Sequence, residues 1–279
     1  MPRMIFCHAR CLIAALLIGI VLPVSADLVF TAPPRETASN TQVDNIYLPI
    51  AEYLSKVLGQ KVNYVYPENW LKYQNEMRDN KYDIVFDGPH FISWRIQHQQ
   101  HEALLRLPGP LDFVLVAKAD DNSLNKHEDL VAKQFCGIAP PNLGTLVILD
   151  KFRNPARQPV VKAIRGGVSE VYAAFKKGEC QAATLRTNFF AKKLTDEERK
   201  QLKVLMKVTG LPNQGFSVGS RVGERERTLI HQALMADEGV KVLEGLIKQF
   251  GKPGDRLVLT NNKEYETYNT LIEGVIFGW

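Results

Sequence analysis

The chain has 279 residues, of which 45% are hydrophobic, enough to build two modest lobes or one large domain and to exclude a disordered chain. The formal charge of +5 is spread among acidic residues along the whole chain. This pattern argues against a nucleic-acid-binding protein, which concentrates Lys and Arg on one face.

Residues 1–26 have the composition of a secretory signal peptide. MPRMIFCHAR carries positive charge, CLIAALLIGIVL is apolar, and PVSA supplies small residues before a cleavage site after Ala26. Cleavage removes Arg3 and Arg10 and leaves a formal charge of +3. The alternative is an uncleaved membrane anchor, although the apolar run is shorter than the ~20 residues of a spanning helix. We expect an exported protein located in the periplasm.

The mature chain then alternates strand-like and helix-like runs. LVFTAPP precedes NIYLPIAEYLSKVLG, KVNYVYP precedes NWLKYQNEMRDNK, and YDIVFDG precedes PHFISWRIQHQ. In the first helix, apolar residues recur at spacings of three and four from Ile46 to Leu58, and Gly59 ends the stripe. Alternation of this kind predicts a parallel sheet covered by helices.

A second set of the same kind follows: FCGIAPP precedes LGTLVILDKF, VVKAIRGG precedes VSEVYAAFKKG, and QAATLR precedes TNFFAKKL. The apolar runs DFVLVAKAD and GFSVGSR bracket this set and are predicted to be the strands that cross between lobes. The sequence therefore predicts a two-lobed α/β fold in which each lobe is a mixed, mostly parallel sheet flanked by helices. Residues 27–116 and 220–279 are assigned to the first lobe and 117–219 to the second. The C-terminal run EYETYNTLIEGVIFGW is expected to pack on the first lobe.

Two cysteines, Cys136 and Cys180, remain after cleavage. An oxidising compartment favours a disulfide between them. Cys136 opens one predicted strand and Cys180 precedes another, so parallel pairing would bring both to the edge of the sheet away from the cleft. Two buried free thiols are the alternative. Neither residue belongs to a CxxC motif or has a His at metal-binding spacing, which argues against redox catalysis and zinc.

Several strands stop at residues that suit the start of a helix. In YDIVFDGPHFISW, Gly88 is placed to cap a helix that begins at Pro89, which leaves the amide of His90 free. APPNLGT, IRGGVSE and LRTN have the same character. Because the carboxyl ends of parallel strands face the ligand crevice, such turns in both lobes predict a clamshell that closes on a small polar ligand. Each turn alone is also an ordinary feature of α/β proteins.

The run IYLPIAEYLSKVLGQKVNYVYPENWLKYQNEMRDNKYDIVFDGPHF resembles the start of the phosphonate, phosphite and phosphate-type substrate-binding proteins of ABC importers. Those proteins read roughly Tyr-x-Pro-Leu-x-x-Tyr-Leu, then Lys-x-Asp-Ile and a Gly-Pro turn. The resemblance implies a periplasmic binding fold of the type II clamshell class, no catalysis of its own, and a membrane permease as partner. An accessory module that senses a ligand and regulates a membrane receptor is the alternative function.

The resemblance also implies ligand contacts. Tyr47 matches the ligand-facing Tyr of the family, and Gln214 stands where relatives carry an acidic residue for an amino group of the ligand. Where the family has a Ser-Thr-Ser-Gly cradle, residues 142–145 read Asn-Leu-Gly-Thr, so two hydroxyls are lost; Arg165 and two glycines stand where relatives carry a His. The candidate ligand-binding residues are Tyr47, Gly88, His90, Asn142, Gly144, Thr145, Arg186 and Gln214.

These donors favour an anion or a polar ligand with acceptor oxygens, because Arg186, and Arg35 if it reaches the cleft, offer planar donor forks. Asp87 would repel an anion if it faced the cleft. We expect it instead to cap the helix or to pair with an Arg or Lys.

Other residues are assigned to packing. His90 is either a ligand donor or a helix-start His packed beside an aromatic ring, and Trp70 is either a cleft aromatic or buried under the second helix. His98 and His101 do not share a helical face with His90, so no metal site is predicted. The sequence lacks the common catalytic and cofactor motifs, which predicts a binding protein without enzymatic activity or cofactor. We also expect a monomer that binds no nucleic acid.

Overall fold

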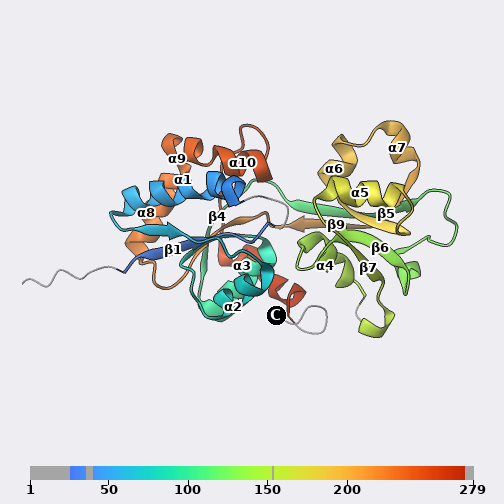
Figure 1. Ribbon diagram of the computed structural model, residues 1–279, viewed down its shortest axis with the longest axis horizontal. Coiled ribbons are helices and arrows are strands. Elements are labelled where there is room, and N and C mark those ends of the chain that lie inside the picture. Colours follow the sequence, from blue (N-terminus) through green and yellow to red (C-terminus); the bar gives the residue numbers. More distant parts are fainter. Residues whose placement is uncertain (1–25, 36–39, 153, 274–279) are drawn as a thin grey trace, which may run out of the picture.

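The computed structural model of the protein describes residues 26–35, 40–152 and 154–273, so the proposed signal peptide lies outside them except for Ala26. Two lobes lie side by side and are joined by extended segments (Figure 1). One lobe is built on a six-stranded sheet and the other on a five-stranded sheet, each flanked by helices. The predicted two-lobed α/β fold is therefore confirmed. The described residues contain no helix that is both long and apolar enough to cross a membrane.

The sheet of the first lobe has the strand order β11-β4-β10-β3-β1-β2. Strand β1 pairs in parallel with β2 and β3, whereas β10 runs antiparallel to both β3 and β4, and β11 antiparallel to β4. The sheet is thus mixed. The strands are β1 (Leu28–Thr31), β2 (Val62–Tyr64), β3 (Ile84–Asp87), β4 (Glu102–Arg106), β10 (Gly215–Val218) and β11 (Val258–Leu259).

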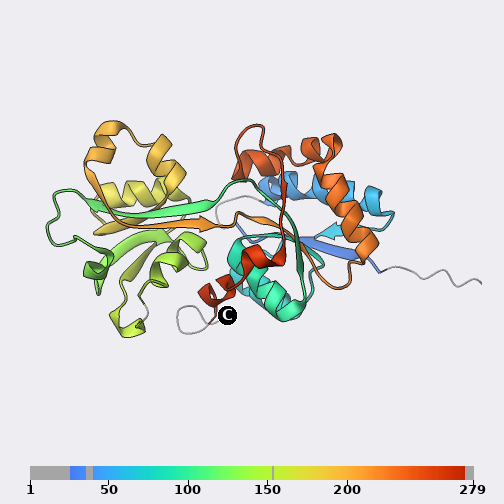
Figure 2. The same cartoon turned by 180° about the vertical axis from the view of Figure 1, so that it is seen from behind.

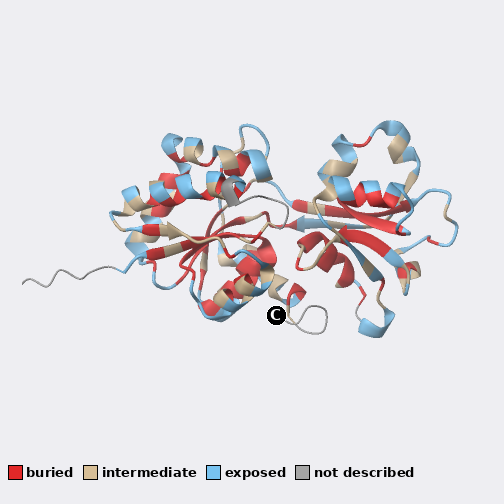
Figure 3. Cartoon of the chain, viewed as in Figure 1, coloured by how far each residue is buried: buried red, intermediate tan, exposed pale blue. Residues whose placement is uncertain are grey.

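Helices cover both faces of this sheet, and strand alternation decides what each face contacts. Phe30, Ile84 and Phe86 belong to a core shared with α1, α8 and α10, while Val85 belongs to a core shared with α2 and α3. The helices are α1 (Asn40–Leu58), α2 (Trp70–Arg78), α3 (Pro89–Gln99), α8 (Glu224–Met235), α9 (Asp237–Val242) and α10 (Glu244–Phe250). In Figure 3 the inner helix faces and the strands are buried while the outer helix faces are exposed.

The sheet of the second lobe has the strand order β7-β6-β8-β5-β9. Strand β6 pairs in parallel with β7 and β8, and β5 runs antiparallel to β8 and β9. One face packs against α5 and the other against α4. The strands are β5 (Leu111–Lys118), β6 (Gln134–Ile138), β7 (Val160–Ile164), β8 (Ala182–Arg186) and β9 (Leu202–Leu211). The helices are α4 (Leu143–Leu149), α5 (Val168–Lys176), α6 (Thr187–Lys192) and α7 (Asp196–Lys200), with short 3-10 turns η1 (His127–Leu130) and η2 (Pro155–Arg157).

The chain crosses between the lobes in residues 107–110 and again in residues 212–214. The two crossing segments are joined by hydrogen bonds from the Leu107 amide to the Gln214 carbonyl (2.9 Å) and from Asn213 Nδ2 to the Pro108 carbonyl (3.0 Å). The predicted boundaries at 116/117 and 219/220 therefore need correction. β5 lies wholly in the second lobe and β10 in the first, because the strands with which they pair lie there.

The C-terminal part packs on the first lobe, as the sequence predicted. Turns η3 (Asn262–Tyr265) and η4 (Tyr268–Leu271) lie against α3, and Figure 2 shows them beside that helix at the side that faces the second lobe. Leu271 and Ile272 share an apolar cluster with Phe91 of the first lobe and Leu146 of the second. The final residues of the predicted segment, 274–279, lie outside the described residues.

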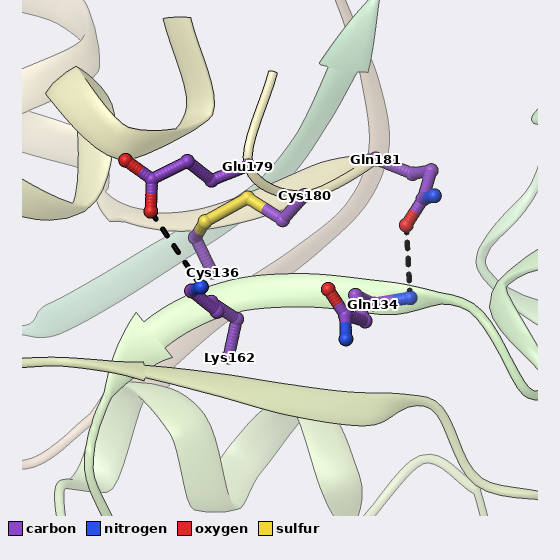
Figure 4. Close-up of a disulfide and its surroundings, with 6 residues drawn as sticks. All are labelled: Gln134, Cys136, Lys162, Glu179, Cys180 and Gln181. Carbon is purple, nitrogen blue, oxygen red and sulfur yellow. Dashed lines mark hydrogen bonds and ion pairs between the residues drawn. A yellow bond between two sulfur atoms is a disulfide. The ribbon is translucent and has the colours of Figure 1, made fainter. Parts of the chain in front are cut away.

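Cys136 and Cys180 form a disulfide with a Cα–Cα distance of 5.7 Å. Cys136 is on β6 and Cys180 precedes β8, and both sulfur-bearing residues belong to the core between the sheet and α5. In Figure 4, Gln134 and Gln181 bridge the same two segments through a hydrogen bond from the Gln134 amide to Gln181 Oε1 (2.9 Å). Lys162 of β7 lies 3.7 Å from Glu179 beside the bond. The disulfide thus ties the second lobe together within itself.

Candidate functional site

A cavity of about 290 Å³ lies between the lobes, and we call it the central cavity. Six of the eight candidate ligand-binding residues line it: Gly88 and His90 of the first lobe, Asn142, Gly144 and Arg186 of the second, and Gln214 of a crossing segment. The rest of its lining is mainly apolar: Pro33, Trp70, Pro89, Phe91, Leu111, Phe113, Ile138, Pro141, Leu143 and Val168. The clamshell arrangement thus brings together candidate residues that are up to 126 positions apart in the sequence, Gly88 and Gln214.

His90 joins the two lobes at this cavity. Gly88 occupies the N-cap position and Pro89 begins α3, as predicted. Nε2 of His90 donates a hydrogen bond to the carbonyl oxygen of Pro141 in the second lobe at 2.9 Å, and the ring lies against Phe91. Burial lowers the pKa of His90 to about 4, against the opposing effect of the Pro141 bond. The imidazole is therefore neutral at pH 7 and links the lobes without a charge.

Arg186 is the cation of the central cavity. It is the last residue of β8, where the strand runs directly into α6, and its guanidinium lies over the Phe113 ring at 5.4 Å. The side chain makes no hydrogen bond or ion pair with a described residue. Burial lowers its pKa, although the attraction of Asp112 opposes the shift. Because a guanidinium stays charged at neutral pH, Arg186 is a poorly hydrated cation that would gain from contact with an anion.

A second hollow of about 320 Å³, the outer cavity, adjoins the first and shares Trp70, Ile138 and Asn142 with it. It contains two more arginines, Arg35 and Arg165. The Arg35 guanidinium lies 5.8 Å from the centre of the Phe250 ring. Among the described residues that line the central and outer cavities there is no Asp or Glu. The two hollows therefore form one positively charged recess.

The neighbouring carboxylates are already engaged. Glu170 accepts a hydrogen bond from the Gly167 amide at 2.7 Å, so this helix start is capped by its own residue. Asp112 accepts one from the Gly210 amide at 2.8 Å and lines an adjoining hollow that shares Arg186 with the central cavity. Asp87 is buried and lies 2.9 Å from Arg95 Nε, and it also accepts a hydrogen bond from Tyr73. The expected pairing of Asp87 with an arginine is confirmed, so this carboxylate does not repel an anion in the cleft.

Two candidate residues do not line the cavity. Tyr47 is 1% exposed and packs in the core of the first lobe between Phe30 and Tyr64, at ring distances of 6.0 and 5.2 Å. Thr145 is fully buried and its Oγ1 donates a hydrogen bond to the Ile138 carbonyl at 2.5 Å. Both assignments are corrected: Tyr47 lies on the apolar stripe of α1, and the hydroxyl of Thr145 turns back to the strand that precedes its helix.

Asn142 and Gly144 have a structural task in addition to their place in the wall. The side-chain oxygen of Asn142 accepts a hydrogen bond from the Gly144 amide at 3.0 Å, which caps α4 as predicted. A Cβ atom at Gly144 would lie 2.7 Å from the Phe113 ring, so only glycine fits between α4 and β5. The Gly144 amide is thus already bonded in this conformation.

Some lining residues were missed or left open by the sequence interpretation. Trp70 is half-buried, stacks on Phe91 at 5.8 Å, and forms a wall common to both cavities. The sequence assigns Phe113 only to a strand that crosses between lobes and assigns no role to Leu111. Their positions could be found only from the pairing of β5 within the second lobe, because an apolar run looks the same whether it ends in a core or at a cavity.

The histidines outside the cavity make separate contacts. His98 lies 2.5 Å from Glu273 through Nε2, and His101 Nδ1 lies 3.1 Å from Ser217 Oγ. Within the part of the chain that the structure describes, no group of three or more His, Cys, Asp or Glu side chains could hold a metal ion.

Comparison of the fold with solved structures gives matches over most of the chain. A protein from Xanthomonas citri bound to ATP superposes with a TM-score of 0.68 at 11% identity, covering 89% of this chain and 98% of that one. PhnD1 from Prochlorococcus marinus in complex with methylphosphonate gives 0.61 at 15% identity, covering 88% and 97%. A binding protein component of an ABC phosphonate transporter from Pseudomonas aeruginosa gives 0.55 at 16% identity, covering 86% and 83%. At these identities the likeness establishes the fold.

No curated protein matches the chain in sequence. A family model described as "ABC transporter, phosphonate, periplasmic substrate-binding protein" matches residues 30–261, from the first strand to beyond the last one. The resemblance first seen in residues 45–91 thus extends across both lobes. Because the match spans most of its length, the chain belongs to the family of periplasmic phosphonate substrate-binding proteins of ABC transporters.

Proposed function

We propose that the protein captures a small oxyanion in the recess between its lobes and delivers it to the membrane permease of an ABC importer. The observation that carries the proposal is Arg186, a half-buried cation without a bonded partner among the described residues, in a recess lined by no described carboxylate. An oxyanion can accept two parallel hydrogen bonds from such a guanidinium.

Ligands of structural relatives support an anion. PhnD1 carries methylphosphonate, and the Xanthomonas protein is bound to ATP in one structure and to chloride in another. All three ligands are negatively charged, although they differ in size. Family membership implies a small ligand, a permease partner and a periplasmic location, and the oxyanion specificity and import role are the part proposed here.

Titration calorimetry with methylphosphonate tests the proposal directly. We expect Arg186→Gln to weaken binding about 10- to 100-fold, because hydrogen bonds between charged groups contribute roughly 1.5–3 kcal/mol. Arg225→Gln is the matched control, since Arg225 is exposed on α8 and outside the recess. Unchanged affinity in Arg186→Gln, or no binding of any oxyanion by the wild-type protein, would contradict the proposal.

The import role has a separate test. Cells whose growth depends on the bound anion should lose uptake when the gene is deleted and regain it with the wild-type copy. Restoration by Arg186→Gln should need a higher external concentration of the anion. Uptake that does not depend on the gene would leave a binding protein without the transport role.

A further inference from the structure

The walls of the central cavity are more apolar than a site for a bare inorganic anion requires. Arg186 lies at one side with its guanidinium over the Phe113 ring, and Trp70, Leu143 and Val168 form other parts of the lining. A fully hydrated ion gains little from such walls, because apolar side chains offer no hydrogen bonds to replace its water. An uncharged organic group attached to the anion would remove these walls from water, which is favourable.

The same walls are unsuited to an ammonium group. A buried ammonium needs a carboxylate, several acceptor oxygens or an aromatic cage to replace its hydration. None of the described residues lining the two cavities is acidic, and Arg35, Arg165 and Arg186 would repel a second positive charge. Glu170 and Asp112, which lie nearby, are bonded to backbone amides.

Trp70 offers the surface on which an organic group would lie. Its ring is held by stacking on Phe91 with an angle of 18° between the planes and by an edge contact with Tyr73 at 6.0 Å. It remains half-buried and lines both cavities, so a substituent leading away from Arg186 passes along it. A large ring that is already fixed can contact a ligand without losing much conformational freedom.

We infer that the ligand is an oxyanion that carries an uncharged apolar group, bound in preference to inorganic phosphate and to an aminoalkyl oxyanion. The inference rests on the proposed function and narrows it: Arg186 holds the oxyanion, and Trp70 and Phe113 contact the apolar group. The absence of an acid among the described lining residues disfavours an ammonium-bearing ligand, and the cavity of about 290 Å³ leaves room for more than a single oxyanion.

Two matched pairs of ligands test this in calorimetry with the wild-type protein. Propylphosphonate and 2-aminoethylphosphonate have the same shape and differ in a methyl against an ammonium group, and methylphosphonate differs from phosphate by a methyl against an oxygen. We expect propylphosphonate to bind at least roughly tenfold more tightly than its amino counterpart and, through two extra methylenes, roughly tenfold more tightly than methylphosphonate. Methylphosphonate should in turn bind more tightly than phosphate.

Trp70→Ala supplies the second readout. It should reduce the ratio of propylphosphonate to methylphosphonate affinity towards one, whereas Leu71→Ala, at a side chain that is 66% exposed on the same helix, should leave the ratio unchanged. The ratio is independent of any general loss of folded protein. Equal affinities within either ligand pair, or an unchanged ratio in Trp70→Ala, would overturn the inference while an oxyanion-binding function stood. If none of the four anions binds, the proposed function fails as well.

Discussion

His90 should make the protein acid-sensitive. Burial lowers the pKa of His90 to about 4. The unfolded chain therefore binds a proton at His90 near pH 6.5, whereas the folded protein binds it only near pH 4. Its contribution to stability is complete above pH 6.5 and is lost as the pH falls towards 4, with a limit of about 3 kcal/mol. Burial lowers the pKa of His101 as well, so the wild-type protein has two such groups.

His90→Gln separates the two histidines, because a Gln amide can still donate to the Pro141 carbonyl but does not titrate. We expect urea unfolding to show a smaller stability loss between pH 7.5 and pH 4.5 in this variant than in the wild type. His101 and the carboxylates whose pKa is lowered, such as Glu198, are intact in both proteins, so the difference between the two proteins reports on His90. Identical pH dependence in the two proteins would show that His90 is not buried in solution as it is in the structure.

Thr145→Val should affect stability and leave ligand affinity nearly unchanged. The Thr145 hydroxyl is buried and bonds the Ile138 carbonyl, which ties α4 to β6. Gly137 gives it room, since a Cβ there would lie 2.5 Å from Thr145 Oγ1. Valine keeps the shape and removes this hydrogen bond, at a cost of about 1 kcal/mol in unfolding free energy. Equal unfolding midpoints combined with weaker methylphosphonate binding would restore Thr145 to the ligand site.

Among the candidate site residues, the sequence predicted those at strand-to-helix turns well and those further inside helices poorly. Arg186 ends β8, and Gly88 and His90 lie at the turn from β3 into the first residues of α3, so topology alone places them at the cleft. Tyr47 and Thr145 belong to helices, where a turn of about 100° per residue separates a cavity position from a core position. The link between His90 and Pro141 joins residues 51 positions apart and depends on how the lobes meet, which no local pattern encodes.

Among the secondary-structure elements, the disulfide between β6 and the start of β8 belongs to the second lobe alone. Its cysteines are 44 positions apart, and closing a loop of this length constrains the unfolded chain by about 4 kcal/mol in the entropic model. We expect reduction to lower the melting temperature without changing methylphosphonate affinity, because the bond lies in the core beneath α5. Alkylation and intact mass show whether the bond is present: two thiols alkylated without reductant would contradict it.

The order of strands and helices was predictable from the sequence, and the point of crossing between lobes was not. Each predicted strand-helix unit appears in the structure, since period-two and period-3.6 patterns are local. The run LDFVLVAK reads equally well as a strand of either lobe. Its place is decided by pairing with β8 and β9, whose residues lie 65 or more positions further along the chain than their partners in β5.

For the whole molecule, an apolar cluster joins the lobes beside the cavity. It unites Trp94 of α3, Phe113 and Leu146 of the second lobe, and Leu271 and Ile272 at the C-terminal turn. This contact stabilises the arrangement of the lobes in the structure, and binding is weakened in proportion to any population in which the lobes separate.

Ile272→Ala should therefore open the protein. We expect a larger radius of gyration in solution scattering without ligand, and weaker apparent affinity for methylphosphonate. Leu124→Ala is the control, because Leu124 is equally buried but lies in a core of the second lobe away from the interface. It should lower stability by about 2–5 kcal/mol without changing affinity. Loss of stability alone in both variants would show that the cluster does not govern closure.

Because the chain crosses between the lobes twice, the second lobe is an insertion in the first: we call the second lobe the guest and the first lobe the host. Leu111 and Leu211, the first and last strand residues of the guest, are partners in the same ladder, and the host ends at Leu107 and Gln214 are hydrogen-bonded to each other. A short turn could therefore replace residues 108–213 and leave the host sheet intact, while the guest keeps its own sheet and disulfide. Each lobe would retain a core, and neither would retain the recess, because residues of both lobes line it. An exchange of the inserted lobe would therefore change the ligand site and leave the sheet of the first lobe unaltered.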